Sequence, residues 1–237
     1  MKKQQLLSLI CFFYATALLA QAQVLVFSKT DGYRHESIEY GIGALIKMGL
    51  EADFNVTATE DAAWFYPEQL AQFDAVIFLN TTENILNSKQ QKAFKGFINN
   101  GGGFVGVHSA ADTEYEWPWY NGLVGAYFES HPEQQTASIL VKEPEHSCCR
   151  ELPNPWEHFD EWYNYKSVQE GLNVVLQLDE ESYQGGNMGS FHPIAWYREY
   201  DGGRMFYTGL GHTKEAYQDP LFLGHLLGGI NYVLERD

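Results

Sequence analysis

The segment from Gly101 to Asp112 constrains the fold of this chain more than any other part of its sequence. Consecutive glycines end a preceding helical stretch, an apolar run follows from Phe104 to Val107, and small residues come directly after His108. This order is typical of a buried parallel strand that ends in a tight turn. In open α/β sheets, strand ends of this kind face the ligand site, and the turn exposes one side chain. The sequence therefore predicts that His108 occupies a turn where a Ser or Cys nucleophile is more usual.

Strand and helix patterns alternate along the first half of the chain, which predicts an α/β protein. Apolar runs and helical spacings predict strands over 24–27, 53–57, 75–79 and 104–107, with helices over 37–50 and 88–99. The second half is richer in strands, which we expect over 137–141, 161–165, 173–178, 194–200 and 205–208, before a closing helix over 220–234. This order predicts a doubly wound, mostly parallel sheet with right-handed crossovers and helices on both faces.

Local signals mark several boundaries of these elements. Ser88, with Gln91 three residues later, predicts a capping box at the start of the second helix. The Asp-Gly-Gly sequence at 201–203 predicts a hairpin turn between the last two strands. Asp219 followed by Pro220 predicts the N-cap and first turn of the closing helix.

The N-terminus has the pattern of a secretory signal peptide. Two lysines precede an apolar run from Leu6 to Ala20, and a small-x-small sequence ends at Ala22. The run is short for a bilayer crossing, and polar residues follow it at once. We therefore predict a signal peptide over 1–22, a single domain over 23–237, and a secreted or periplasmic protein with no membrane anchor after cleavage.

The chain is strongly acidic. Its 15 lysines and arginines stand against 31 aspartates and glutamates, which gives a formal net charge of −16 at pH 7. Such a charge repels polyanions, so nucleic acids and anionic membranes are excluded as expected partners. Solubility is the simplest interpretation, and a small molecule or a second copy of the chain is the expected partner.

Cysteine usage argues against a disulfide-based fold. Of three cysteines, only the adjacent Cys148 and Cys149 remain after the predicted cleavage. A long-range disulfide framework is therefore excluded, and a bridge between neighbours requires a strained backbone. We expect two free or buried thiols, and because neither follows the strand-turn pattern we do not expect thiol catalysis.

Polar residues follow several of the predicted parallel strands. His35, Glu83 and His108 lie just beyond strand ends, and His212 follows a later strand in a glycine-flanked stretch. Because the carboxyl ends of parallel strands share one edge of a sheet, these side chains are expected to face one crevice. Three imidazoles and a carboxylate suit a divalent metal with an open position, or a base assisted by acids. Each histidine taken singly also fits a purely structural role.

Aromatic residues are dense over 115–120 and 156–165. Trp and Tyr rings stack on the apolar faces of sugars while nearby carboxylates accept hydrogen bonds from hydroxyls. An equally good interpretation is that these rings cover the edge of the sheet. As a sugar-binding set we predict Asp112, Trp117, Glu161, Tyr163 and His192.

Taken in order, five segments of the chain resemble the ThuA-like family, which is named for trehalose utilisation. The segments are Gly32–His35, Gly101–Ala110, Asp160–Tyr163, His192–Trp196 and Gly203–His212. The resemblance implies a three-layer α/β sandwich of the class I glutamine amidotransferase-like, or flavodoxin-like, type. His108 replaces the cysteine nucleophile of that superfamily, so its amidotransferase chemistry is not implied. Members are associated with the breakdown of disaccharides oxidised to 3-keto glycosides.

These observations lead to a hypothesis for the reaction. A carbonyl at C3 acidifies the C2 proton, so a base and an electrophile would permit isomerisation or elimination at C1. We predict zinc, manganese or iron at His35, His108 and His212, with Glu83 or Asp160 as the base. His108 is counted with the catalytic residues, and without a metal Arg34 would polarise the keto oxygen.

Two other functions are compatible with the sequence. A non-catalytic carbohydrate-binding protein would use the aromatic clusters and need none of the histidines. An esterase or peptidase is less favoured, because Ser109 lacks the glycine frame of a nucleophile elbow.

Overall fold

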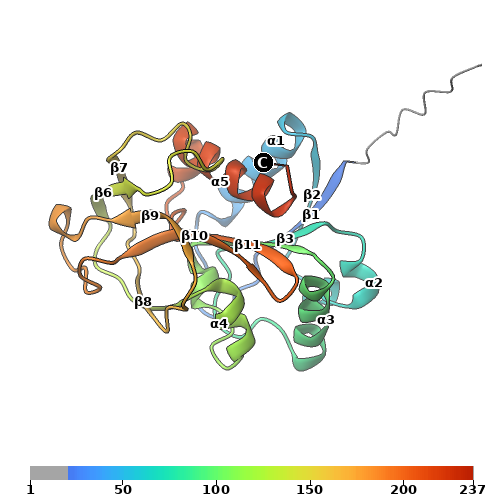
Figure 1. The fold of residues 1–237 in the computed structure, drawn as a ribbon. Helices are drawn as coiled ribbons and strands as arrows, with labels where there is room; N and C mark the ends of the chain where they lie inside the picture. Colours follow the sequence, from blue (N-terminus) through green and yellow to red (C-terminus); the bar gives the residue numbers. More distant parts are fainter. Residues whose placement is uncertain (1–20, 237) are drawn as a thin grey trace, which may run out of the picture.

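The computed structural model describes residues 21–236, so all but the last two residues of the predicted signal peptide lie outside it. A nine-stranded sheet crosses the molecule (Figure 1). In spatial order its strands are β2 (Phe54–Thr59), β1 (Ala22–Phe27), β3 (Ala75–Leu79), β4 (Gly103–Val107), β11 (Gly203–Thr208), β10 (Pro193–Tyr200), β9 (Asn173–Leu178), β6 (Gln135–Val141) and β7 (Trp156–Asp160). A separate ribbon pairs β5 (Tyr127–Ser130) with β8 (Asn164–Lys166).

Helices cover both faces of the large sheet (Figure 1). On one face lie α1 (Ile38–Glu51) and α5 (Pro220–Val233), and on the other lie α2 (Pro67–Leu70), α3 (Ser88–Asn99) and α4 (Pro118–Val124). Short 3-10 turns occur at Ala62–Trp64, His108–Asp112, Glu180–Ser182 and Ala216–Gln218. The chain is therefore an α/β protein with three layers, as the alternating pattern predicts.

The sheet is parallel in only one half. From β2 through β1, β3 and β4 to β11 each pairing is parallel, in the 2-1-3-4-5 order of flavodoxin-like sheets with β11 in the fifth place. From β11 to β7 each pairing is antiparallel. The prediction of a mostly parallel sheet thus needs correction, because the second half has no helices long enough to serve as crossovers and its strands pair through hairpins and loops.

The expected strand over 161–165 is wrong for its first residues. The chain leaves β7 after Asp160 and pairs again only at Asn164, so Glu161 begins a link between the two sheets. Trp162 is fully buried there, and its indole Nε1 donates a hydrogen bond to the Gln135 carbonyl at 2.8 Å. The aromatic pattern therefore signalled burial rather than strand pairing.

The capping box of α3 lies one residue earlier than predicted. Asn87, not Ser88, is the N-cap, and its Oδ1 accepts hydrogen bonds from the amides of Lys89 and Gln90 at 3.0 and 3.1 Å. The Gln90 side chain accepts a hydrogen bond from the Asn87 amide at 2.9 Å and closes the box. Asn is as good an N-cap as Ser, so the local pattern offered two adjacent registers. The predicted cap of α5 is confirmed, because Asp219 accepts a hydrogen bond from the Leu221 amide at 2.9 Å.

Alanine substitutions at these two adjacent positions test the register of the box. We expect Asn87→Ala to lower the free energy of unfolding by about 1 kcal/mol, because two amide donors lose their acceptor. Ser88→Ala is the matched control and is expected to change it by less than about 0.5 kcal/mol. Urea denaturation of both variants measures the difference. A larger loss for Ser88→Ala would contradict the observed register.

Side-chain packing joins the helices to the sheet on both faces. Phe78 on β3 stacks on Phe94 of α3 with ring centroids 5.2 Å apart. On the other face, a Cβ at Gly229 of α5 would lie 2.1 Å from the ring of Phe206 on β11. The two layers are therefore closely packed, and they hold the carboxyl ends of the parallel strands in fixed positions. No helix within residues 21–236 is long and apolar enough to span a bilayer.

Candidate metal centre

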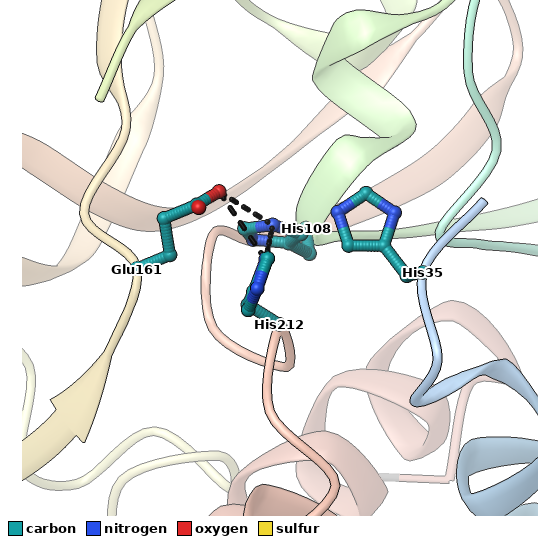
Figure 2. Close-up of side chains that lie close together, drawn as sticks. All are labelled: His35, His108, Glu161 and His212. Carbon is teal, nitrogen blue, oxygen red and sulfur yellow. Dashed lines mark hydrogen bonds and ion pairs between the residues drawn. The ribbon is translucent and has the colours of Figure 1, made fainter. Parts of the chain in front are cut away.

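Three histidines meet at the carboxyl ends of the parallel strands. His35 follows β1, His108 follows β4 directly, and His212 lies just beyond β11. The three rings are mutually near perpendicular, with each pair of centroids 5.0 Å apart. Glu161 approaches them from the antiparallel side of the sheet (Figure 2). Two halves of the fold therefore contribute to one cluster.

The donor atoms of this cluster have the spacing of metal ligands. One ligand atom from each of His35, His108, Glu161 and His212 lies within 4.8 Å of the other three. His108 Nε2 is 3.1 Å from His212 Nδ1 and 3.4 Å from Glu161 Oε2. Glu161 Oε2 is in turn 3.2 Å from His212 Nδ1. Ligands about 2.05 Å from a tetrahedral zinc ion are about 3.3 Å apart. The arrangement fits a four-coordinate site, or a wider site with an open position.

Backbone strain places His108 in the cluster. Its φ of 49° is rare for a residue with a Cβ, and the Tyr207 hydroxyl donates a hydrogen bond to its carbonyl at 2.8 Å. The ring Nδ1 lies 2.9 Å from the carbonyl oxygen of Gly209, to which it donates. That hydrogen bond leaves the lone pair on Nε2, which faces the cluster.

The protonation states of two members match those of metal ligands. Burial, together with the neighbouring His108 and His212, lowers the pKa of His35 to about 2, so the ring is neutral. Burial alone would raise the pKa of Glu161, but the adjacent rings of His108 and His212 hold it well below its usual range. A neutral imidazole and an ionised carboxylate are the forms that bind cations, and mixed N and O donors suit zinc, manganese and iron.

Asp160 holds the backbone around the cluster instead of joining it. It is fully buried, and Oδ2 accepts a hydrogen bond from the Gly211 amide at 2.7 Å. Oδ1 accepts hydrogen bonds from the amides of His212 at 3.1 Å and Glu161 at 2.9 Å. Because these amides occupy both oxygens, the predicted role of Asp160 as a base is replaced by one in positioning two of the candidate ligands.

The other two predicted polar residues lie apart from the cluster. Arg34 is about 40% exposed, and its guanidinium pairs with the carboxylates of Glu39 at 2.6 Å and Glu60 at 2.8 Å. Glu83 is exposed, and its backbone amide bonds to the Asp112 carbonyl at 2.7 Å. The predicted convergence of Glu83 with the histidines is not observed, because the group of close donor atoms contains Glu161 and not Glu83.

The predicted sugar-binding residues are spread over several environments. Tyr163 is buried with its ring 4.2 Å from that of His108, and His192 Nε2 lies 2.8 Å from the Tyr163 carbonyl oxygen. Trp117 packs on Trp119, with centroids 4.8 Å apart, near the start of α4. Tyr163 therefore supports His108 directly, and sugar binding by Tyr163, His192 and Trp117 stays a prediction. Asp112 ends the 3-10 turn that begins with His108, and burial raises its pKa.

Sequence reasoning missed three members of the site. Glu161 was expected to bind sugar, but its carboxylate lies among the histidines. His131 is about half-exposed, with Nδ1 3.2 Å from Glu161 Oε1, and the Gln134 amide lies 2.8 Å from His212 Nε2. His131 precedes a proline, which indicates a turn, but no spacing could have shown that this turn lies beside His212. The polar rim formed by His131 and Gln134 is the solvent side of the cluster.

A large pocket of the molecule lies away from this cluster. A cavity of about 1140 Å³ is lined by α2, α3 and the segments that lead into β1, β3 and β4. It therefore lies at the amino ends of the parallel strands, opposite the histidines. Because ligand chemistry in open α/β sheets is found at the carboxyl ends, the buried polar cluster is the better candidate site.

Comparison with known families agrees with this architecture. The sequence profile of the family described as "ThuA: Trehalose utilisation" matches residues 23–233, nearly the whole of the described chain. The chain belongs to the ThuA family. This membership connects the protein with carbohydrate utilisation. No curated protein sequence gives a significant match.

Solved structures share the ThuA fold. A ThuA-like protein from Bacteroides uniformis has 23% identity and a TM-score of 0.78, with 96% of this chain and 97% of that one covered. One from Parabacteroides merdae has 18% identity and a TM-score of 0.73, with 90% of each chain covered. A β-galactosidase from Rahnella sp. R3 has 13% identity and a TM-score of 0.60, and 92% of this chain matches 32% of that one. At these identities the likeness concerns the fold alone.

The segments by which the chain resembles the ThuA family surround the candidate centre. His35, His108 and His212 each end one of them, or lie near its end, and Glu161 belongs to a fourth. The remaining segment supplies His192, whose Nε2 lies 2.8 Å from the carbonyl oxygen of Tyr163, two residues after Glu161. The motifs that characterise this ThuA chain are therefore the ones that build one polar cluster.

Proposed function

We propose that this protein is a metal-dependent enzyme that acts on oxidised, 3-keto glycosides by acid–base elimination or isomerisation. The observation that carries the proposal is the convergence of His35, His108, Glu161 and His212 at the carboxyl edge of the sheet. Donor atoms of His108, Glu161 and His212 lie 3.1 to 3.4 Å from one another, which is the spacing of ligands around a divalent cation. Family membership supports a carbohydrate as the substrate.

A bound divalent cation would act as a Lewis acid toward the keto oxygen at C3. The protein must then supply a group that accepts the C2 proton. As that proton leaves, its electron pair forms the C1–C2 double bond and the C1–O bond breaks. The departing oxygen takes up a proton, so charge and atoms balance. His131, half-exposed at the rim, is placed to donate that proton.

Asp112 is the proton acceptor in this proposal. It lies four residues beyond His108 on the same turn. Burial raises the pKa of Asp112 and the Glu83 carboxylate raises it further, while a hydrogen bond from the Tyr115 hydroxyl opposes both. A raised pKa suits a general base near neutral pH. This assignment replaces Glu83 and Asp160 in that role, since Glu83 is exposed and Asp160 binds three amides.

Metal removal and restoration test the proposal. We expect elemental analysis to find about one more zinc, manganese or iron ion per chain in the wild-type protein than in His108→Ala. Chelation is expected to abolish release of nitrophenol from nitrophenyl 3-keto-glucosides, and returning the ion should restore it. Asp112→Asn should keep the metal and lose about 10²- to 10⁴-fold in rate.

Other outcomes would overturn the proposal in distinct ways. Sugar that binds and is recovered unchanged, with no effect of chelator, would identify a carbohydrate-binding protein. Unchanged turnover after chelation would exclude the metal. We further propose export from the cytoplasm, which N-terminal sequencing of the mature protein tests by looking for a chain that begins at Gln23.

A further inference from the structure

A second cluster of metal-binding side chains lies beneath α5, away from the histidine centre. Cys148 and Cys149 belong to the loop between β6 and β7, and His225 is on α5. All three residues are at most 2% exposed. The proposed reaction uses none of them.

The donor atoms of these residues lie within metal-binding distance of one another. The two Sγ atoms are 3.5 Å apart, and a ring nitrogen of His225 lies within 4.8 Å of both. Two thiolates about 2.3 Å from a tetrahedral zinc ion are about 3.8 Å apart. His146 lies at the edge of the cluster, since its Nδ1 is 3.1 Å from Cys148 Sγ and accepts a hydrogen bond from the Cys148 amide at 3.3 Å.

The surrounding backbone holds the cysteine loop against the helix. A Cβ at Gly228 would lie 2.3 Å from Cys148 Cα, so only glycine permits this approach. The Ser147 hydroxyl donates a hydrogen bond to the Gly228 carbonyl at 3.1 Å. His225 Nδ1 lies 2.9 Å from the Cys148 carbonyl oxygen and Nε2 lies 3.1 Å from the Thr208 hydroxyl, so these contacts orient the ring, and one of them is released when the ring binds a cation. The donors are thus preorganised by contacts around them.

We propose that Cys148, Cys149 and His225 bind a divalent thiophilic cation, with Zn²⁺ as the natural ion. Sulfur ligands select zinc over magnesium, calcium and manganese, which prefer oxygen. Two thiolates and a neutral imidazole around Zn²⁺ have no net charge, which makes complete burial acceptable. Because all three ligand residues are at most 2% exposed, the site is structural and ties the β6–β7 loop to α5.

Cadmium is the probe, because its thiolate complexes absorb in the ultraviolet. The full chain is expressed in cadmium-supplemented medium, so that the ion is present while the site folds. We expect a cadmium–thiolate band that corresponds to one ion per chain. The double variant Cys148→Ser/Cys149→Ser should lack the band, and His225→Gln should weaken cadmium retention by at least about 10-fold. His108→Ala should keep the band and the cadmium retention of the wild type.

Three results would overturn this proposal. One is the absence of a cadmium–thiolate band from folded wild-type protein. A second is a band that survives in the double cysteine variant, since Cys11 would then be its source. The third is a disulfide between Cys148 and Cys149, in place of two free thiols, in protein purified with zinc present. His108→Ala separates the sites, because failure of the histidine centre would leave the cadmium–thiolate band unchanged.

Discussion

Replacing His108 with alanine is expected to abolish metal binding at the histidine centre and, with it, turnover. Its Nε2 is 3.1 Å from His212 Nδ1 and 3.4 Å from Glu161 Oε2, so it is a central donor of the cluster. Loss of residues that only support ligands costs about 10- to 100-fold in metal affinity, so loss of a ligand should exceed about 100-fold. Isothermal titration of metal-depleted protein with Zn²⁺ and Mn²⁺ measures the change.

The matched control for this substitution is His146→Ala, which removes a histidine from the other cluster. This variant should retain full affinity at the histidine centre, because its ring contacts Cys148 and Tyr197 rather than His35 or His212. Both variants need a circular dichroism spectrum like that of the wild type. Wild-type metal affinity in folded His108→Ala would refute the assignment of the centre.

Replacing Asp160 with asparagine is expected to destabilise the fold and to weaken the metal centre together. The carboxylate is fully buried and accepts three backbone hydrogen bonds, from Glu161, Gly211 and His212. An amide cannot accept at both positions, so at least one donor becomes unsatisfied. Hydrogen bonds to charged acceptors contribute about 1.5 to 3 kcal/mol each, so the loss in unfolding free energy should be about 3 kcal/mol.

The effect on metal binding separates positioning from mere stability. If Asp160 positions the loop that carries His212, the folded variant should also lose about 10- to 100-fold in metal affinity. Asp31→Asn changes an exposed carboxylate and should leave both quantities near those of the wild type. Denaturant unfolding and metal titration of the same preparations give the two values. A destabilised variant with unchanged metal affinity would show that Asp160 has a structural role only.

Much of the fold could be predicted from local pattern. The strand over 75–79 and the helix over 88–99 have the predicted bounds, because an unbroken apolar run and a helical spacing act within a few residues. The turn between the last two strands also follows from its residues, since Asp201 and Gly202 take positive φ values of 51° and 99°. Strand pairing in the second half was less accessible, since apolar alternation does not tell which strand is the neighbour.

Some residues of the candidate site could also be predicted from local pattern, and others could not. His35, His108 and His212 could be identified because each follows a parallel strand, and the carboxyl ends of such strands share one edge. Glu161 could not be assigned to the cluster, since it arrives from the antiparallel half through a link with no regular structure. Asp160 was expected to be a base, but its burial and its three amide contacts, which the sequence does not show, make it a positioning residue.

The sequence by itself determined the α/β class, the positions of most elements and the strand-end histidines, because these depend on periodicity, caps and turns within short segments. Only the tertiary structure decided that Glu161 completes the histidine cluster and that Cys148 and Cys149 lie beside His225. Those contacts join residues far apart in the sequence, since Glu161 and His212 are 51 positions apart and Cys148 and His225 are 77 apart. The order of strands in the sheet and the paths of loops bring them together. No local pattern encodes such distances, since they result from the packing of the whole chain.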